Sequence, residues 1–154
     1  MLDMIQLVDL DHAGELDAFV CSHDNCHFMQ TSLWGKVKRD WGWYGLISRD
    51  GSGTIRGTMA LLRHDSKVLR SCFLYAPRGP ICPPEDAGTF RELIEGAKRL
   101  ARELKAYRLR IDPLIPSDDL RFQGLAADMC FLKDDSGDFS LFQPRMCYVL
   151  TLNG

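Results

Sequence analysis

The feature of the sequence that most constrains the fold is a long amphipathic helix, which we expect over about residues 86–106. Its charged residues fill one face, and its apolar residues recur at the spacing of the opposite face. The apolar set is Phe90, Leu93, Ile94, Ala97, Leu100, Ala101 and Leu104. Because such a stripe must be buried, this helix requires a second layer of structure beside it.

Strand-like runs on both sides of this helix can supply that layer. We expect strands at residues 4–8, 43–48, 54–64, 67–76, 107–112 and 147–152. Glycines in 49–53 and a turn at 64–66 join the middle three strands into an antiparallel meander. Shorter helices are expected at residues 11–21, 31–41 and 117–130, the last with Ser117 as its cap. This order predicts one α+β domain over residues 1–154, with a central mixed, largely antiparallel sheet flanked by helices.

Composition fits a soluble globular domain rather than a nucleic-acid or membrane-spanning protein. Hydrophobic residues make up 45% of the 154 residues, charged residues 26%, and the net charge is −2. No apolar run reaches the roughly 18 residues that a membrane-spanning helix needs. We therefore expect a cytoplasmic protein, peripheral at most to the inner face of the membrane, whose six cysteines are free thiols.

The order of elements resembles the GNAT acyltransferase fold, in which backbone amides after the fourth strand hold the pyrophosphate of acyl-CoA. Here that loop is rich in prolines, which lack the amide hydrogen that a phosphate needs. A phosphate-loop pattern does occur as "RFQGLA" at residues 121–126, but inside an expected helix whose amides are already bonded. An acyl-CoA-dependent GNAT N-acyltransferase is therefore the alternative, and we expect no bound cofactor.

The stretch "CSHDNCH", residues 21–27, gathers cysteine and histidine, which are zinc ligands. Its spacing matches no familiar zinc motif, and adjacent Cys26 and His27 would be awkward ligands of one tetrahedral ion. We interpret it as a polar turn, expect no metal site, and expect the histidines to be surface residues.

Two stretches indicate binding. In "YAPRGP", two prolines and a glycine fix a turn that presents Arg78 with little ordering cost. Arg78 either clamps an anion or sugar, or pairs with a carboxylate such as Asp112 to hold the loop. In "WGKVKRDWGW", cations lie among Trp34, Trp41 and Trp43, which suits a phosphate or sugar ligand or, alternatively, an amphipathic helix with buried tryptophans.

Four motifs in order resemble the Fem transferases. "MQTSLWGKVKRDWGW" is similar to their opening motif, and "YAPRGP" to their Tyr-x-Pro-Arg-Gly-Pro turn. "LRIDP" resembles the strand end after their long helix, and "QPRMCYVLTL" the segment that closes their first domain. The family transfers an amino acid from aminoacyl-tRNA to the stem peptide of lipid II or UDP-MurNAc-pentapeptide, and its members have two GNAT-like domains.

The resemblance implies that this chain is the first of those domains, with the second absent. Lys38, or neighbouring Lys36, would meet the phosphates of the peptidoglycan precursor, and Tyr75 and Arg78 would line the same pocket. The substrate-binding residues implied are Trp34, Lys36, Lys38, Tyr75, Arg78, Gly79 and Asp112. Aminoacyl-tRNA would be the co-substrate of the full-length enzyme.

The resemblance assigns no catalytic residue to this chain. Relatives place an aspartate soon after the turn, whereas the first acids here are Glu85 and Asp86. We therefore expect precursor binding with weak or no turnover. A third interpretation is an inactive interaction module, which forms a homodimer through an exposed sheet edge.

Overall fold

The structure is a computed structural model that describes residues 5–116 and 118–133. Its strands form one sheet in the order β1-β2-β3-β4-β5. Their bounds are β1 (Ile5–Val8), β2 (Gly42–Arg49), β3 (Ile55–Ser66), β4 (Ser71–Pro77) and β5 (Ala106–Asp112). Strands β1 to β4 pair antiparallel with one another, and β5 runs parallel to β4 after the helical crossover. The mixed, largely antiparallel sheet is therefore confirmed.

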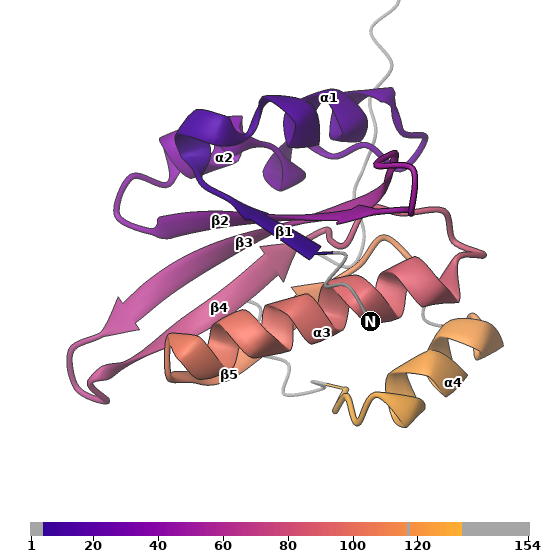
Figure 1. Ribbon diagram of the computed structural model, residues 1–154. Coiled ribbons are helices and arrows are strands. Elements are labelled where there is room, and N and C mark those ends of the chain that lie inside the picture. Colours follow the sequence, from indigo (N-terminus) through magenta and orange to yellow (C-terminus); the bar gives the residue numbers. More distant parts are fainter. Residues whose placement is uncertain (1–4, 117, 134–154) are drawn as a thin grey trace, which may run out of the picture.

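Helices cover both faces of the sheet (Figure 1). One face carries α1 (Gly14–Ser22) and α2 (Ser32–Val37), with the short 3₁₀ helices η1 (Leu10–His12) and η2 (Phe28–Gln30) nearby. The other face carries α3 (Ala87–Glu103) and α4 (Leu120–Asp128). None of the described helices has the length and apolar character needed to cross a bilayer.

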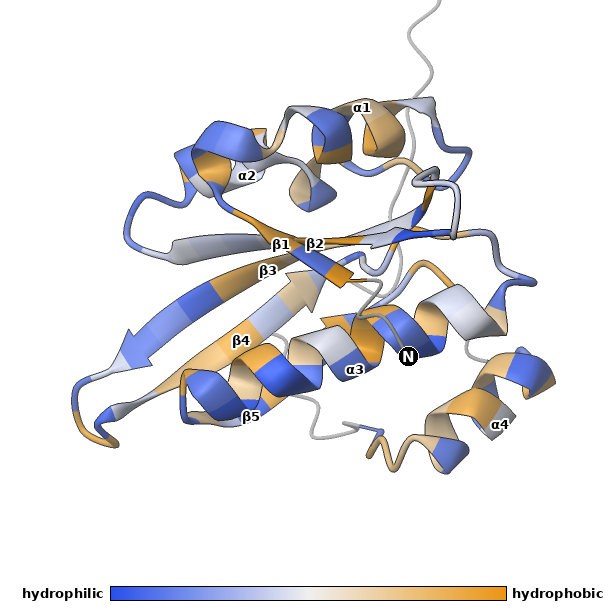
Figure 2. Ribbon diagram, viewed as in Figure 1, coloured by the Kyte–Doolittle hydropathy of each residue, from blue (hydrophilic) through white to orange (hydrophobic). Residues whose placement is uncertain are grey.

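The sheet separates two hydrophobic cores. The apolar face of α3 packs on one side, where Leu93, Ile94 and Ala97 are fully buried. Hydrophobic and hydrophilic residues both occur along α3 in Figure 2, as its amphipathic pattern requires. On the opposite side, α1 buries Leu16 and Val20 against the sheet. The helix that dominates the sequence pattern therefore organises the fold.

The structure corrects several expected boundaries. The β3–β4 turn lies at 67–70 rather than 64–66, because β3 continues to pair with β4 as far as Ser66 opposite Ser71. The helix expected at 11–21 starts at Gly14, since the preceding residues form η1. Asp119 rather than Ser117 caps α4. The strand expected at 147–152 lies outside the described residues.

Candidate functional site

The site is built around the Arg-Gly-Pro turn that follows β4. Because β4 and β5 are parallel, their carboxyl ends meet at one edge, where Pro77 is paired with Asp112. The next residue, Arg78, has a φ of 59°, in the left-handed region that side chains other than glycine seldom adopt. Such backbone outliers cluster at functional sites. The turn thus directs the largely buried side chain of Arg78, 13% exposed, toward the end of β5.

Three side chains converge at this edge. Arg78 Nη1 lies 3.7 Å from Asp112 Oδ2, an ion pair longer than a hydrogen bond. The hydroxyl of Tyr75 donates to the same carboxylate oxygen at 3.3 Å. Burial, together with the charge of Asp112, raises the pKa of Tyr75 to about 12. The phenol therefore stays protonated at neutral pH and acts as a hydrogen-bond donor.

The side chain of Gln30 supports the turn through hydrogen bonds to the backbone. Its side chain is completely buried. The amide nitrogen donates to the carbonyl oxygens of Pro77, at 2.7 Å, and Ala60, at 3.1 Å, while the amide oxygen accepts from Ala60 N at 2.8 Å. A Cβ on Gly79 would lie 2.5 Å from that amide, so glycine is required for the backbone to approach it. Gly79 therefore has a structural role in the turn.

An aromatic row leads from the turn toward α2. The ring of His27 stacks on Phe28 at 4.9 Å between centroids, and Phe28 meets Trp34 edge to face at 5.3 Å. Lys38 Nζ lies 5.3 Å from the centroid of the Trp34 ring, a cation–π distance. Phe28 thereby connects His27, the last residue of the polar stretch, to the cluster around Trp34.

His27 lies close enough to the turn for the charges of Arg78 and Asp112 to affect its pKa. Burial lowers the pKa of His27, the Arg78 cation lowers it further, and Asp112 opposes that effect. Its Nδ1 accepts a hydrogen bond from Met29 N at 3.2 Å, so the neutral ring carries its hydrogen on Nε2. His27 is half-buried beside the candidate site, and is therefore less exposed than the surface position expected for it.

Apart from Gly79, whose role is described above, the residues expected from the sequence divide into three groups. Tyr75, Arg78 and Asp112 form one contact cluster, and the ion pair weighed as an alternative role for Arg78 is present. Trp34 and Lys38 form a second cluster. Lys36 is exposed in the last turn of α2 and takes part in none of the contacts above.

Sequence reasoning missed Gln30, His27 and Phe28. Gln30 stands within the opening motif, which was the available signal, but a buried amide cannot be told from a surface one by residue type. His27 and Phe28 lie in a stretch whose composition is typical of a turn. Their role depends on the η2 helix, in which the His27 side chain caps Met29 N.

The N-termini of α3 and α4 are closed by the chain's own carboxylates. Asp86 accepts from Thr89 N at 3.0 Å and pairs with Arg56 at 2.6 Å, at the start of α3. Burial by itself would raise the pKa of Asp86, but these hydrogen bonds outweigh it and lower the pKa. Asp119 likewise accepts from the first amides of α4. This arrangement argues against an acyl-CoA pyrophosphate at either end.

A pocket of about 120 Å³ lies beyond the turn, between the loop before α3 and the segment around α4. Its walls include Ile81, Phe90 and Phe122, with Cys82 among them. Burial raises the pKa of the Cys82 thiol to about 12. The pocket therefore fits a small apolar group, and its thiol is no nucleophile at neutral pH.

The polar stretch 21–27 assembles no metal site. Within 5–116 and 118–133 there is no group of three or more cysteine, histidine or acidic side chains arranged to hold a metal ion. The five cysteines in those ranges are free thiols.

The architecture places the chain in a broad fold class, the GNAT type. A solved structure described as a probable acetyltransferase covers 97% of this chain and 98% of its own, with a TM-score of 0.63 and 15% identity. At that identity the likeness concerns the fold alone. The crystal structure of FemX covers 80% of this chain with a TM-score of 0.70 and 24% identity.

Within that class the chain belongs to the FemAB family, which it matches over residues 12–129. The curated lipid II:glycine glycyltransferase of Staphylococcus haemolyticus (strain JCSC1435) is 33% identical over 105 residues, or 68% of this chain. The protein of that name from Staphylococcus aureus (strain bovine RF122 / ET3-1) is 34% identical over 107 residues. The chain spans about 25% of the length of these relatives and 31% of FemX.

Proposed function

We propose that this chain is the peptidoglycan-precursor-binding part of an aminoacyl-tRNA-dependent peptidyltransferase. The complete enzyme would add an amino acid to the stem peptide of lipid II or UDP-MurNAc-pentapeptide, on the cytoplasmic side of the membrane. Membership of the FemAB family and the names of the curated relatives support this proposal. The single observation that carries it is the constrained Arg78 turn beside Tyr75 and Asp112.

The proposed binding mode uses what the two precursors share, a pyrophosphate next to a sugar. A guanidinium recognises phosphate oxygens in a planar fork, and Asp112, at 3.7 Å, orients Arg78 until phosphate takes over that role. Lys38 would supply a second cation, while Trp34 and Tyr75 would provide walls for the sugar. Lys36 is exposed and remains a secondary candidate.

The test is a calorimetric titration of the chain with UDP-MurNAc-pentapeptide, with acetyl-CoA as the comparison ligand. Arg78→Ala and Lys38→Ala should each weaken binding by about 1.5–3 kcal/mol, the value of a charge-assisted contact. Arg78→Lys should recover only part of the loss, because a lysine cannot form the bidentate fork. The matched control is Arg91→Ala, an exposed arginine of α3 on the opposite face of the sheet.

The outcomes are distinct. Binding of the precursor that Arg78→Ala weakens and Arg91→Ala leaves unchanged supports the proposal. Binding of acetyl-CoA without binding of the precursor would replace it with the acyl-CoA-dependent alternative. Precursor binding that is equal in all variants would mean that the site lies elsewhere.

A homodimer through a sheet edge remains a prediction. Within the described residues β5 is paired on one side only, by β4. An edge of this kind presents unpaired backbone groups to a second strand. Sedimentation equilibrium over a range of concentrations would detect a species of twice the 17.5 kDa chain mass.

A further inference from the structure

The β3–β4 hairpin carries a feature that the proposed site does not use. Pairing between β2 and β3 ends at Arg63, so β3 continues beyond it with β4 as its strand partner. The hairpin therefore projects from the body of the molecule (Figure 1). Its turn, residues 67–70, is here called the hairpin tip. At this tip Val68 is 91% exposed and Leu69 57% exposed.

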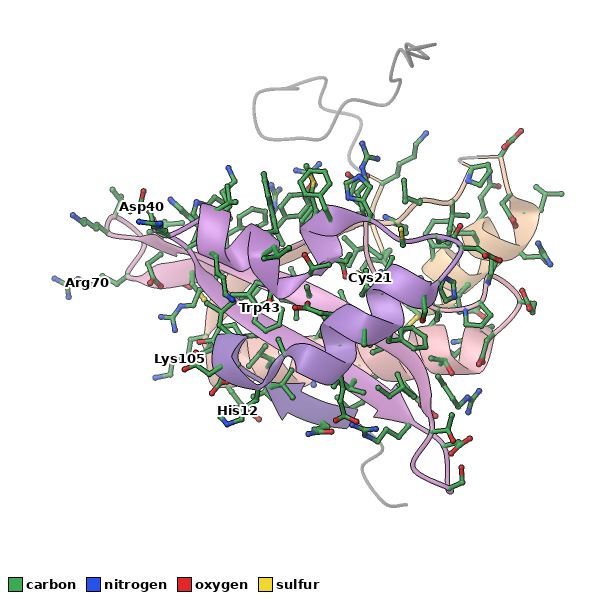
Figure 3. All side chains as sticks on the ribbon, turned by 90° about the horizontal axis from the view of Figure 1, so that it is seen from above. His12, Cys21, Asp40, Trp43, Arg70 and Lys105 are labelled. Atoms are coloured by element: carbon green, nitrogen blue, oxygen red, sulfur yellow. The ribbon has the colours of Figure 1, made fainter. Side chains whose placement is uncertain are left out.

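Cations surround these two aliphatic side chains. Lys67 and Arg70 flank them directly in the sequence and are exposed. The turn after α3 lies against the base of the hairpin, since Ser71 Oγ donates to the carbonyl oxygen of Lys105. Arg70 and Lys105 are found toward the same end of the molecule in Figure 3.

Two of the acids near the tip are themselves offset by cations. Asp65, which precedes the tip, pairs with Arg63 at 2.8 Å. Glu103, at the end of α3, is flanked by Arg102 and is followed by Lys105. The overall charge of the chain is −2, so the basic character is local to this end.

The tip is also ordered. Leu69 N donates to Ser66 Oγ at 3.2 Å, and Arg70 adopts a φ of 48° that reverses the chain. The area of two aliphatic side chains is far below the roughly 800 Å² per partner that a stable protein interface buries. The tip instead suits interfacial lipid binding, in which aliphatic side chains insert at the headgroup boundary and cations contact anionic headgroups.

We propose that the hairpin tip docks this chain onto an anionic lipid bilayer, with Val68 and Leu69 entering the interface and Lys67 and Arg70 contacting headgroups. Lys105 adds charge at the same end. The proposal rests on the exposure and charge of the hairpin, and not on the substrate proposed above. It would bring the chain to a membrane surface whether its precursor is lipid-linked or free.

The test is flotation of the full 154-residue chain with vesicles of phosphatidylcholine containing roughly a third phosphatidylglycerol, and with vesicles of phosphatidylcholine alone. We expect binding to the anionic vesicles that falls as salt is raised. Val68→Asp/Leu69→Asp should weaken it by about tenfold or more, and so should Lys67→Gln/Arg70→Gln, since each membrane-facing cation contributes severalfold. Circular dichroism verifies that the variants are folded.

The matched control is Leu33→Asp/Val37→Asp, which alters two exposed aliphatic residues of α2. This variant should bind as the parent chain does. The proposal is overturned if the parent chain ignores anionic vesicles, if it binds neutral vesicles equally well, or if only the α2 variant loses binding. Precursor binding in calorimetry should be unchanged in the tip variants, which separates this inference from the proposed function.

Discussion

Gly79 lies at the closest approach between the Arg-Gly-Pro turn and the buried amide of Gln30. A methyl group there would lie 2.5 Å from the Gln30 amide and would displace it from its bonds to Ala60 and Pro77. We therefore expect Gly79→Ala to lower the free energy of unfolding by about 1–3 kcal/mol, the usual cost of overpacking. Urea denaturation measures this change.

The matched control is Gly124→Ala in α4. No atom lies within 4 Å of a Cβ built at Gly124, and helical alanine is favoured over glycine by about 0.5–1 kcal/mol. The control should therefore be neutral or stabilising. A Gly79 variant as stable as the parent chain would contradict the role assigned to Gln30.

His27 provides a pH-dependent prediction. Because burial and the Arg78 cation lower its pKa in the folded chain, the unfolded chain takes up the proton first as the pH falls below 6.5. Stability contributed by neutral His27 is then lost as the pH falls through that window, and it rises with pH there. His27→Asn keeps a side-chain acceptor for Met29 N and should flatten this rise.

His12 is the control of opposite sign. Its hydrogen bond with Asp9 raises the pKa of His12, so its stabilisation is present below 6.5 and disappears as the pH rises through the higher folded value. His12→Asn removes this contribution, so the rise of stability with pH should become steeper, whereas His27→Asn should make it flatter. Thermal unfolding measured across this pH range distinguishes the two.

Residue types alone predicted part of the site. Arg78 and its partner Asp112 could be proposed because both stand at strand ends next to prolines, where the sequence restricts the backbone. Gln30 and Phe28 could not, because their contacts are with segments 30 or more positions away in the chain or depend on a short 3₁₀ helix. Long-range packing of this kind leaves no periodic signal.

At the scale of elements, the start of α3 is fixed by Asp86. Its carboxylate caps Thr89 N and pairs with Arg56. Asp86→Ala should lower the free energy of unfolding by about 1–2 kcal/mol, as the loss of other helix N-caps does. Chemical denaturation checks this value.

The pH dependence of the same residue gives a second readout. The lowered pKa of Asp86 means that its contribution is present above the ordinary value of 3.8 and is lost as the pH falls through the folded value. Asp128→Ala removes a more exposed ion pair, with Arg91, and should cost less. Equal effects of the two substitutions would argue that the cap is unimportant.

Elements with a strong periodic pattern were predicted well, and their boundaries less well. The pattern of α3 predicted both its position and the face it buries, since seven apolar residues share that face. The β3–β4 turn was placed too early because His64–Ser66 is polar, a composition typical of turns. That segment extends past the end of β2, which stops pairing with β3 at Arg63.

At the scale of the whole molecule, the sheet joins two cores, and the tryptophans lie in only one of them. All three tryptophans of the chain belong to the core beneath α1 and α2, while α3 packs on the opposite face. Strands β2 and β3 contribute residues to both cores, so the two layers should unfold together. Tryptophan fluorescence therefore reports the side of the sheet under α1 and α2, whereas circular dichroism reports the backbone of the whole cooperative unit.

Leu93→Ala tests this coupling, because Leu93 is fully buried in the core without tryptophan. The substitution should lower the free energy of unfolding by about 2–5 kcal/mol, the range for buried leucines. Tryptophan fluorescence and far-ultraviolet circular dichroism should both report the same shifted transition in urea. If the circular dichroism transition shifts while the fluorescence transition stays in place, the two layers unfold separately. The site at the ends of β4 and β5 would then depend less on the α3 layer than the shared sheet implies.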